Sequence, residues 1–246
     1  MKIASFALSD IGKVRRENQD TSGHFPRRNL FVVADGMGGH KGGKQASELA
    51  IATIEKRFAV STDGDPAPAE LPTLLEAIGE ANLRIIERGA EDEALRRMGT
   101  TLVALILDGH AEGVVVHIGD SRVYRLRNQA LELLTLDHTV VSDLVRSREI
   151  SEAEAITHPY RHVLTRALGG AHEVLPDVRH IDVRSGDVYL LCSDGVSGML
   201  APQDIEAIVT THRHDPEAVC RELIAAANRA GGRDNATAIV VRCTAD

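Results

Sequence analysis

The stretch FVVADG at residues 31 to 36 runs from four apolar side chains directly into Asp35-Gly36, and YLLCSDG at residues 189 to 195 ends in the same dipeptide. Short runs rich in Val, Ile, Leu and aromatic residues are typical of β-strands. Each stretch therefore places a carboxylate, Asp35 or Asp194, at the end of a strand. The two stretches predict a core built on strands, with acid groups at its edge.

Other apolar runs predict further strands, and the segments between them predict helices. The predicted strands cover residues 30–34, 100–107, 113–118, 121–126, 187–193 and 236–243. Apolar residues recur at helical spacing from Ala46 to Ile54 and from Leu71 to Ile86, so both segments are expected to pack on a sheet. A third helix is expected after Asp215-Pro216, because Asp can cap a helix and Pro fits its first turn.

The connections between the central strands are short. Asp108-Gly109 and Gly119-Asp120 are tight-turn sequences between consecutive predicted strands. They predict that the middle of the chain is a meander and that the sheets are largely antiparallel, with helices outside them.

A third acid group belongs with the two at the strand ends. Asp234 comes just before the last predicted strand, and in an antiparallel sheet the start of one strand lies beside the end of its neighbour. Asp35, Asp194 and Asp234 can therefore converge, and three such carboxylates repel one another unless they bind a metal. Hard divalent cations prefer oxygen ligands, and Gly36 leaves room for a backbone carbonyl to bind the same ion. The alternative is that each Asp-Gly only forms a turn.

The composition suits a single domain over residues 1–246, since 43% of the residues are hydrophobic. A net charge of -8 disfavours a nucleic-acid groove, which would need clustered Lys and Arg. Three widely separated cysteines in apolar surroundings favour reduced core residues over disulfides or a thiolate metal site. The N-terminus MKIASFALSD has no basic region followed by an apolar stretch, and no run of about eighteen apolar residues occurs. We therefore expect a cytoplasmic protein without a membrane span.

An ordered set of motifs overrides the turn interpretation. The chain contains VRRENQD at 14–20, VVADGMGGHKGG at 32–43, MGTT at 98–101, IGDSRVYRL at 118–126, LTRALG at 164–169, LLCSDG at 190–195 and GGRDNATAIVV at 231–241. In this order, and over nearly its whole length, it resembles the metal-dependent PPM (type-2C) family of protein serine/threonine phosphatases, in its bacterial style. The resemblance implies an α+β fold, a four-layer αββα sandwich of two packed, mainly antiparallel sheets flanked by helices. It also implies hydrolysis of phosphoserine and phosphothreonine monoesters by a metal-activated water, in opposition to bacterial Ser/Thr kinases, by an enzyme expected to be a monomer.

The resemblance also assigns metal ligands, for Mn²⁺ or Mg²⁺ in two tightly bound sites. It makes Asp35 the carboxylate that bridges the two cations, with the Gly36 carbonyl on one of them. Asp194 and Asp234 match the ligands of the other cation, and Asp20 matches an acid that acts through metal-bound water.

Two further assignments come from the same resemblance. Arg15 matches the guanidinium that holds the substrate phosphate, a task that suits its planar fork of donors, whereas the neighbouring Arg16 is expected to be a solvated surface charge. Asp120 matches a residue that binds a third cation together with Asp194, although an Asp in a Gly-Asp turn needs no metal.

The group that protonates the leaving alkoxide is not settled by these motifs. Relatives in eukaryotes often place a His directly after the metal-binding Asp-Gly, and this chain has Met37 there. His40, three residues further on, is a candidate, although a loop histidine is more often only a solvated polar group. The segment at residues 138–170 resembles the mobile flap of the family, in which Asn often replaces His162; its alternative is an ordinary pair of surface helices.

Two other functions fit parts of the sequence. A metal-dependent phosphodiesterase or nuclease also uses paired cations, but the acidic balance disfavours it. A catalytically inactive binding module would be expected to lack metal aspartates, and all of them are present. A cysteine-nucleophile phosphatase is disfavoured because Cys192 lies within an apolar run.

Overall fold

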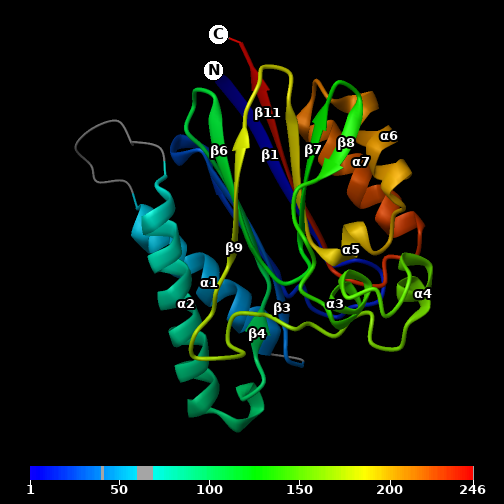
Figure 1. Cartoon of the computed structure of the whole chain (residues 1–246). Helices are drawn as coiled ribbons and strands as arrows, with labels where there is room; N and C mark the ends of the chain where they lie inside the picture. The colour runs from blue at the N-terminus through cyan, green and yellow to red at the C-terminus, as the bar shows by residue number, and fades with distance from the viewer. Residues whose placement is uncertain (40–41, 60–68, 246) are drawn as a thin grey trace.

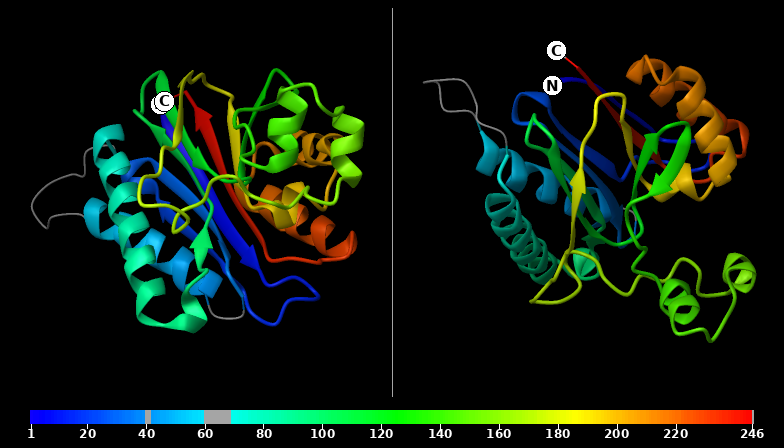
Figure 2. Two further views of the ribbon diagram at one scale, coloured as in Figure 1. Left: turned by 60° about the horizontal axis from the view of Figure 1, so that its bottom comes forward. Right: turned by 45° about the horizontal axis from the view of Figure 1, so that its top comes forward.

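In the computed structural model, which describes residues 1–39, 42–59 and 69–245, two β-sheets pack face to face between two layers of helices (Figure 1, Figure 2). The first sheet contains β1 (Lys2–Asp10), β11 (Ala236–Thr244), β10 (Val188–Cys192), β7 (Arg122–Arg127) and β8 (Ala130–Leu133), in that spatial order. The second contains β2 (Asp20–Phe25), β3 (Leu30–Met37), β5 (Leu102–Leu107), β6 (Glu112–Ile118) and β9 (Asp177–Asp182), with β4 (Gly99–Thr100) paired to β3. Every strand pair is antiparallel, which confirms the four-layer αββα prediction.

The helices cover the two outer faces and one end of the sandwich. Helices α1 (Gly42–Phe58) and α2 (Leu71–Glu91) lie on the second sheet. Helices α5 (Asp194–Ser197), α6 (Pro202–His212) and α7 (Pro216–Arg229) lie on the first. Two short helices, α3 (Val140–Arg146) and α4 (Glu152–Thr157), form the predicted flap segment at the end of the sandwich away from the chain termini (Figure 1). Short 3-10 turns, η1 (Pro26–Arg28) and η2 (Glu93–Leu95), complete the described elements.

Alternation along β3 explains why its sequence is apolar on both faces. Phe31 and Val33 belong to the core between the two sheets, whereas Val32 and Ala34 belong to the core under α1 and α2. A third core joins the first sheet to α6 and α7. Three apolar layers therefore hold four layers of secondary structure together, and β3 is fixed from both sides.

The predicted elements are present, with one error of topology. All six predicted strands occur, although the 100–107 run is divided into β4 and β5, and Asp215 caps α7 by accepting hydrogen bonds from the N–H groups of Glu217 and Ala218 at 3.0 and 3.2 Å. Asp108-Gly109 does close a hairpin between β5 and β6. The meander prediction is wrong beyond that point, because Gly119-Asp120 carries the chain from β6 in one sheet to β7 in the other.

Candidate active site

A cavity of about 550 Å³ gathers most of the predicted site residues from segments far apart in the sequence, although Asp20 is not part of its lining. Its lining includes Arg15, Asp35, Gly36, Asp120, Asp194 and Asp234, together with Met37 and His162. Asp194 begins α5 just after β10, and Asp234 comes just before β11, which pairs with β10. The antiparallel pairing of β10 and β11 thus places these two acids side by side, as expected.

Asp35 lies within β3 rather than in a turn, and its backbone is held on both sides. Its N–H donates to Thr101 Oγ1 at 3.0 Å, and its carbonyl accepts from Thr100 Oγ1 at 2.9 Å and from the Thr101 N–H at 2.9 Å. These threonines of the MGTT motif therefore fix the strand that carries the central carboxylate.

The glycines that follow Asp35 and Asp194 are required by close packing. A Cβ on Gly36 would lie 2.1 Å from the Gly43 carbonyl oxygen, and one on Gly195 would lie 1.8 Å from the Asn235 carbonyl oxygen. Neither glycine has a positive φ, and they belong to β3 and α5. The Asp-Gly dipeptides thus let backbones from distant segments meet at the cavity, and turn formation does not explain them.

Asp20 lies directly opposite Asp35 in the β2–β3 pair and is buried. Its Oδ2 accepts hydrogen bonds from Ser193 Oγ and Thr237 Oγ1, both at 2.7 Å, whereas its Oδ1 is buried without a hydrogen-bond partner among the described residues. Burial raises the pKa of Asp20 to about 6, against the effect of the two hydroxyl donors. An orphaned carboxylate oxygen at this position fits a role in holding a cation or its water.

Burial and mutual repulsion raise the pKa values of Asp35, Asp120 and Asp194. Burial, followed by the charges of Asp20, Asp194, Asp120 and Asp234, raises the pKa of Asp35 well above its usual range. Burial and the charge of Asp194 raise the pKa of Asp120 to about 7, and burial with the charge of Asp234 raises the pKa of Asp194. Such a cluster is stable in its ionised form only with compensating positive charge, so this all-oxygen donor set fits hard divalent cations.

Arg15 supplies positive charge at the rim of the cavity. Its Nη2 donates to Asp234 Oδ2 at 2.6 Å, and 52% of its side chain is exposed. The loop that carries it is held by Asn235, whose amide donates to the carbonyls of Ile11 and Glu17. Arg16 is exposed and lines a separate surface hollow.

The candidates for the proton donor differ in position. His40 lies outside the described residues. Met37 lines the cavity but has no proton to give. His162 enters the cavity from the flap segment, and the sequence motifs gave it no part in proton transfer.

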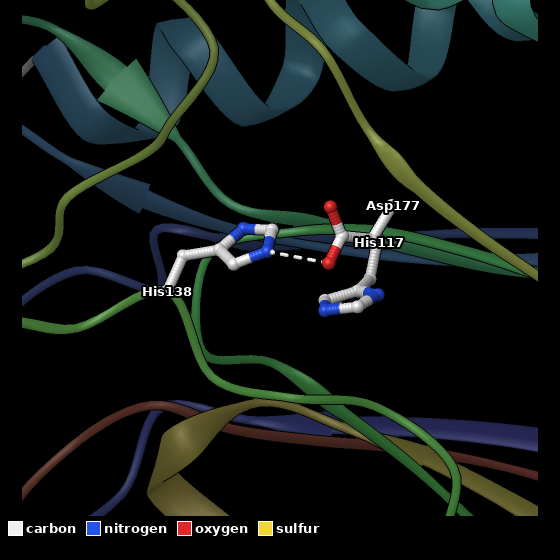
Figure 3. Close-up of side chains that lie close together, drawn as sticks. All are labelled: His117, His138 and Asp177. Atoms are coloured by element: carbon white, nitrogen blue, oxygen red, sulfur yellow. Dashed lines mark ion pairs between the residues drawn. The ribbon is translucent and has the colours of Figure 1, made fainter. Parts of the chain in front are cut away.

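A second group of potential metal ligands does not line this cavity, and Figure 3 shows how its three side chains lie. The ligand atoms of His117, His138 and Asp177 lie within 4.8 Å of one another. However, His138 Nδ1 accepts from the Gly119 N–H at 3.2 Å, and its Nε2 lies 3.3 Å from Asp177 Oδ2. Arg166 also donates to Asp177 Oδ1 at 2.7 Å.

These contacts assign a hydrogen-bonded network to the group in place of a metal site. Both nitrogens of His138 are engaged, and its ring stacks on that of His117 with centroids 4.7 Å apart and planes 20° from parallel. Near-parallel rings do not direct their lone pairs at one ion. The network instead supports the Gly119-Asp120 turn, because His138 also donates its backbone N–H to the Gly119 carbonyl at 2.9 Å.

Sequence reasoning missed several residues that hold the site. Ser193 and Thr237 were quoted only as parts of motifs, and Asn235, His138 and Asp177 were given no role. Their only local signal is a polar side chain within or beside an apolar strand.

The three cysteines are buried and free, as expected, and burial raises the pKa of Cys192 to about 12. No nucleophilic thiolate is therefore available there. Within the described residues, no helix has the length and apolar character needed to cross a bilayer.

Comparisons with known proteins agree with this geometry. A family model described as protein phosphatase 2C matches residues 13–230. The protein phosphatase PhpP of Streptococcus pneumoniae is 37% identical over 239 residues, which cover 95% of each chain. A crystal structure of the Mycobacterium tuberculosis serine/threonine phosphatase PstP/Ppp superposes with a TM-score of 0.88 at 37% identity, covering 99% of both chains. A structure of the catalytic domain of a serine/threonine protein phosphatase PstP in complex with two manganese ions has a TM-score of 0.86 at 35% identity, again over 99% of both chains.

Proposed function

This chain belongs to the protein phosphatase 2C family, and from this premise we propose that it is a metal-dependent phosphoprotein phosphatase that hydrolyses phosphoserine and phosphothreonine monoesters. The observation that carries the proposal is the convergence of Asp35, Asp120, Asp194 and Asp234 on one cavity, beside the orphaned oxygen of Asp20. Because these ionised acids repel one another, bound cations would stabilise the cluster.

The residues divide into those that hold cations and those that hold the substrate. Asp35 would bridge two ions, Gly36 would offer its carbonyl to one, and Asp194 and Asp234 would bind the other. Asp20 would act through water. When bound, paired divalent cations lower the pKa of water and offset the charge of the phosphate during in-line attack.

Arg15 would bind the phosphate of the substrate. Its guanidinium already faces the cavity and pairs with one carboxylate at the rim, so little rearrangement is needed for it to meet phosphate oxygens. Among the described residues that line the cavity, none is a covalent nucleophile of the thiolate type, and attack by water on the phosphorus is the reaction that this set of side chains supports.

The finer details of the metal content are also proposed. Mn²⁺ or Mg²⁺ suits the all-oxygen ligands, and two tight sites follow from the ligand set around Asp35. Asp120, which lines the same cavity as Asp194 and a neighbouring one of about 360 Å³, would bind a third, weaker cation together with it.

The cellular setting rests on the relatives named as serine/threonine phosphatases. We propose that residues 1–246 form one phosphatase domain, monomeric and cytoplasmic, that acts on phosphorylated proteins in opposition to Ser/Thr kinases.

The test is release of phosphate from phosphoserine, phosphothreonine and phosphotyrosine peptides with and without Mn²⁺, beside the diester bis-p-nitrophenyl phosphate. We expect Mn²⁺-dependent hydrolysis of phosphoserine and phosphothreonine peptides and little diester cleavage. Strong diester hydrolysis with inert phosphopeptides would assign the site to a phosphodiesterase. Mn²⁺ binding without any turnover would assign it to an inactive binding module.

A further inference from the structure

His162 occupies a special position between the two cavities. It lines the 550 Å³ cavity with Asp35 and Asp194, and it also lines the adjoining 360 Å³ cavity with Asp120 and Asp194. It belongs to the segment that returns from α4 toward the bridge between Thr139 and Leu164. The flap segment therefore brings an imidazole to the boundary between the 550 Å³ cavity and the 360 Å³ cavity.

Hydrolysis of a serine or threonine phosphate needs a proton for the leaving oxygen. The leaving oxygen is a poor leaving group as an alkoxide, and a positioned acid lowers this barrier. Other described residues that line the 550 Å³ cavity do not supply this proton. The carboxylates are the proposed cation ligands, and the Arg15 guanidinium stays protonated. Met37 has no exchangeable proton. His162 is the one lining side chain in the described part of the chain whose type exchanges protons near neutral pH.

The His162 ring is also free to act. It is exposed, and it makes no hydrogen bond with the other described residues. The buried imidazoles of His117 and His138 differ in this respect, since both are engaged by backbone groups.

We propose that His162 is the general acid of this enzyme and protonates the serine or threonine oxygen as it leaves phosphorus. The inference rests on the proposed phosphatase function. As the bond between phosphorus and the substrate oxygen breaks, its electron pair stays on that oxygen, which takes the proton from the imidazolium. The attacking water releases one proton to solvent, and its oxygen becomes the fourth oxygen of inorganic phosphate. The imidazole then regains a proton from solvent, so that protons balance over the cycle.

The experiment compares His162→Ala and His162→Asn with wild type on two substrates. One is a phosphothreonine peptide, and the other is p-nitrophenyl phosphate, whose leaving group needs little protonation. We expect kcat for the phosphopeptide to fall by about 10²–10⁴, the usual worth of general acid catalysis, and the loss on p-nitrophenyl phosphate to be at least about tenfold smaller. The Mn²⁺ concentration for half-maximal rate should stay the same. Asn should not rescue the rate, because an amide cannot transfer the proton.

His158→Ala is the matched control. His158 is also a flap histidine, its Nδ1 accepts the Tyr160 N–H at 3.2 Å, and it lines neither cavity, so both activities should be retained. Equal losses on both substrates, rescue by Asn, or a near-native kcat on the phosphopeptide would overturn the assignment. A wild-type protein without Mn²⁺-dependent turnover of either substrate would instead refute the proposed function on which the assignment rests.

Discussion

Asp20 and Ser193 lie 173 positions apart in the sequence and are joined by a hydrogen bond of 2.7 Å in which the serine hydroxyl donates to Asp20 Oδ2. Ser193 also accepts the Thr237 N–H at 3.0 Å and directly precedes Asp194. One hydroxyl thus connects the second sheet to the first at the metal cluster. It fixes one oxygen of Asp20, whereas the other oxygen has no hydrogen-bond partner in the described part of the chain.

Ser193→Ala should therefore weaken both the fold and the site. Loss of a donor to a buried carboxylate costs about 1–3 kcal/mol of unfolding free energy, and Asp20 would lose its fixed orientation. Urea unfolding and Mn²⁺ calorimetry measure the two effects. Ser22→Ala, which changes a partly buried serine on the same strand as Asp20, is the control. Unchanged stability and Mn²⁺ affinity in Ser193→Ala would show that the hydrogen bond does not support the site.

The stability of the metal-free protein should fall as pH rises from about 4 to about 7. Burial and neighbouring carboxylates raise the pKa of Asp35, and they raise that of Asp120 to about 7, whereas both are near 4 in the unfolded chain. Between pH 4 and pH 7 these carboxyl groups are already ionised in the unfolded chain but still protonated in the folded protein. Raising the pH through this range therefore favours unfolding. Melting curves in a chelator at pH 5 and pH 7.5 test this.

The same experiment has an internal control. Asp35→Asn removes one charge from the cluster, so the chelated variant should melt at a higher temperature than chelated wild type at pH 7.5, and saturating Mn²⁺ should reverse the order. If the variant and wild type show the same pH dependence in chelator, the cluster is not a source of repulsion.

Arg15→Ala should raise KM for a phosphopeptide by about tenfold or more, since one charge-assisted hydrogen bond is worth about 1.5–3 kcal/mol. Such a contact is made in the ground state and the transition state alike, so kcat should change less. Metal affinity should barely change, because the ion pair with Asp234 is exposed. Arg16→Ala is the matched control. A KM equal to that of wild type would make Arg15 only a surface charge.

Asp120→Ala should leave the two tighter sites filled and slow phosphopeptide hydrolysis more than hydrolysis of p-nitrophenyl phosphate. A third cation held by few carboxylates binds more weakly, so the variant should lose the low-affinity phase of the Mn²⁺ titration. This loss separates it from His162→Ala, for which the titration is expected to be unchanged. No change on either substrate would return Asp120 to the role of a turn residue.

The sequence predicted the parts of the fold that carry strong local signals. The apolar runs of FVVADG and YLLCSDG lie in β3 and β10, as predicted. These continuous runs are a strong signal because both faces of each strand are buried. Four strands were missed. Among them, β9 (DVRHID) and β8 (ALEL) lie at sheet edges, where exposed polar side chains weaken the apolar pattern.

The step from β6 to β7 could not be predicted for another reason. A Gly-Asp turn has the same sequence whether the next strand pairs with the preceding strand or enters a second sheet. The choice depends on tertiary packing, here that of Val123 in the core between the two sheets.

The site was predicted in two different ways. The convergence of Asp35, Asp194 and Asp234 followed from strand ends and antiparallel pairing, whereas Asp20 and Arg15 came from family resemblance alone. Nothing local in the sequence indicates that Asp20 faces Asp35 or that Ser193 and Thr237 hold it. The hydrogen bonds from Ser193 and Thr237 to Asp20 join residues more than 170 positions apart, so they exist only once both sheets have assembled.

The central claim is that Asp35 holds two cations on which turnover depends. It is tested most directly by Mn²⁺ calorimetry and phosphopeptide turnover measured on the same samples of wild type, Asp35→Asn and Asp108→Asn. The control variant changes the acid of an Asp-Gly dipeptide that does not line the cavity, and Asp108 caps the β5–β6 hairpin by accepting from the His110 and Glu112 N–H groups. We expect two tight Mn²⁺ ions and full turnover in wild type and Asp108→Asn, and loss of tight binding and of activity in a folded Asp35→Asn. Two tight ions with near-native turnover in Asp35→Asn would contradict the account.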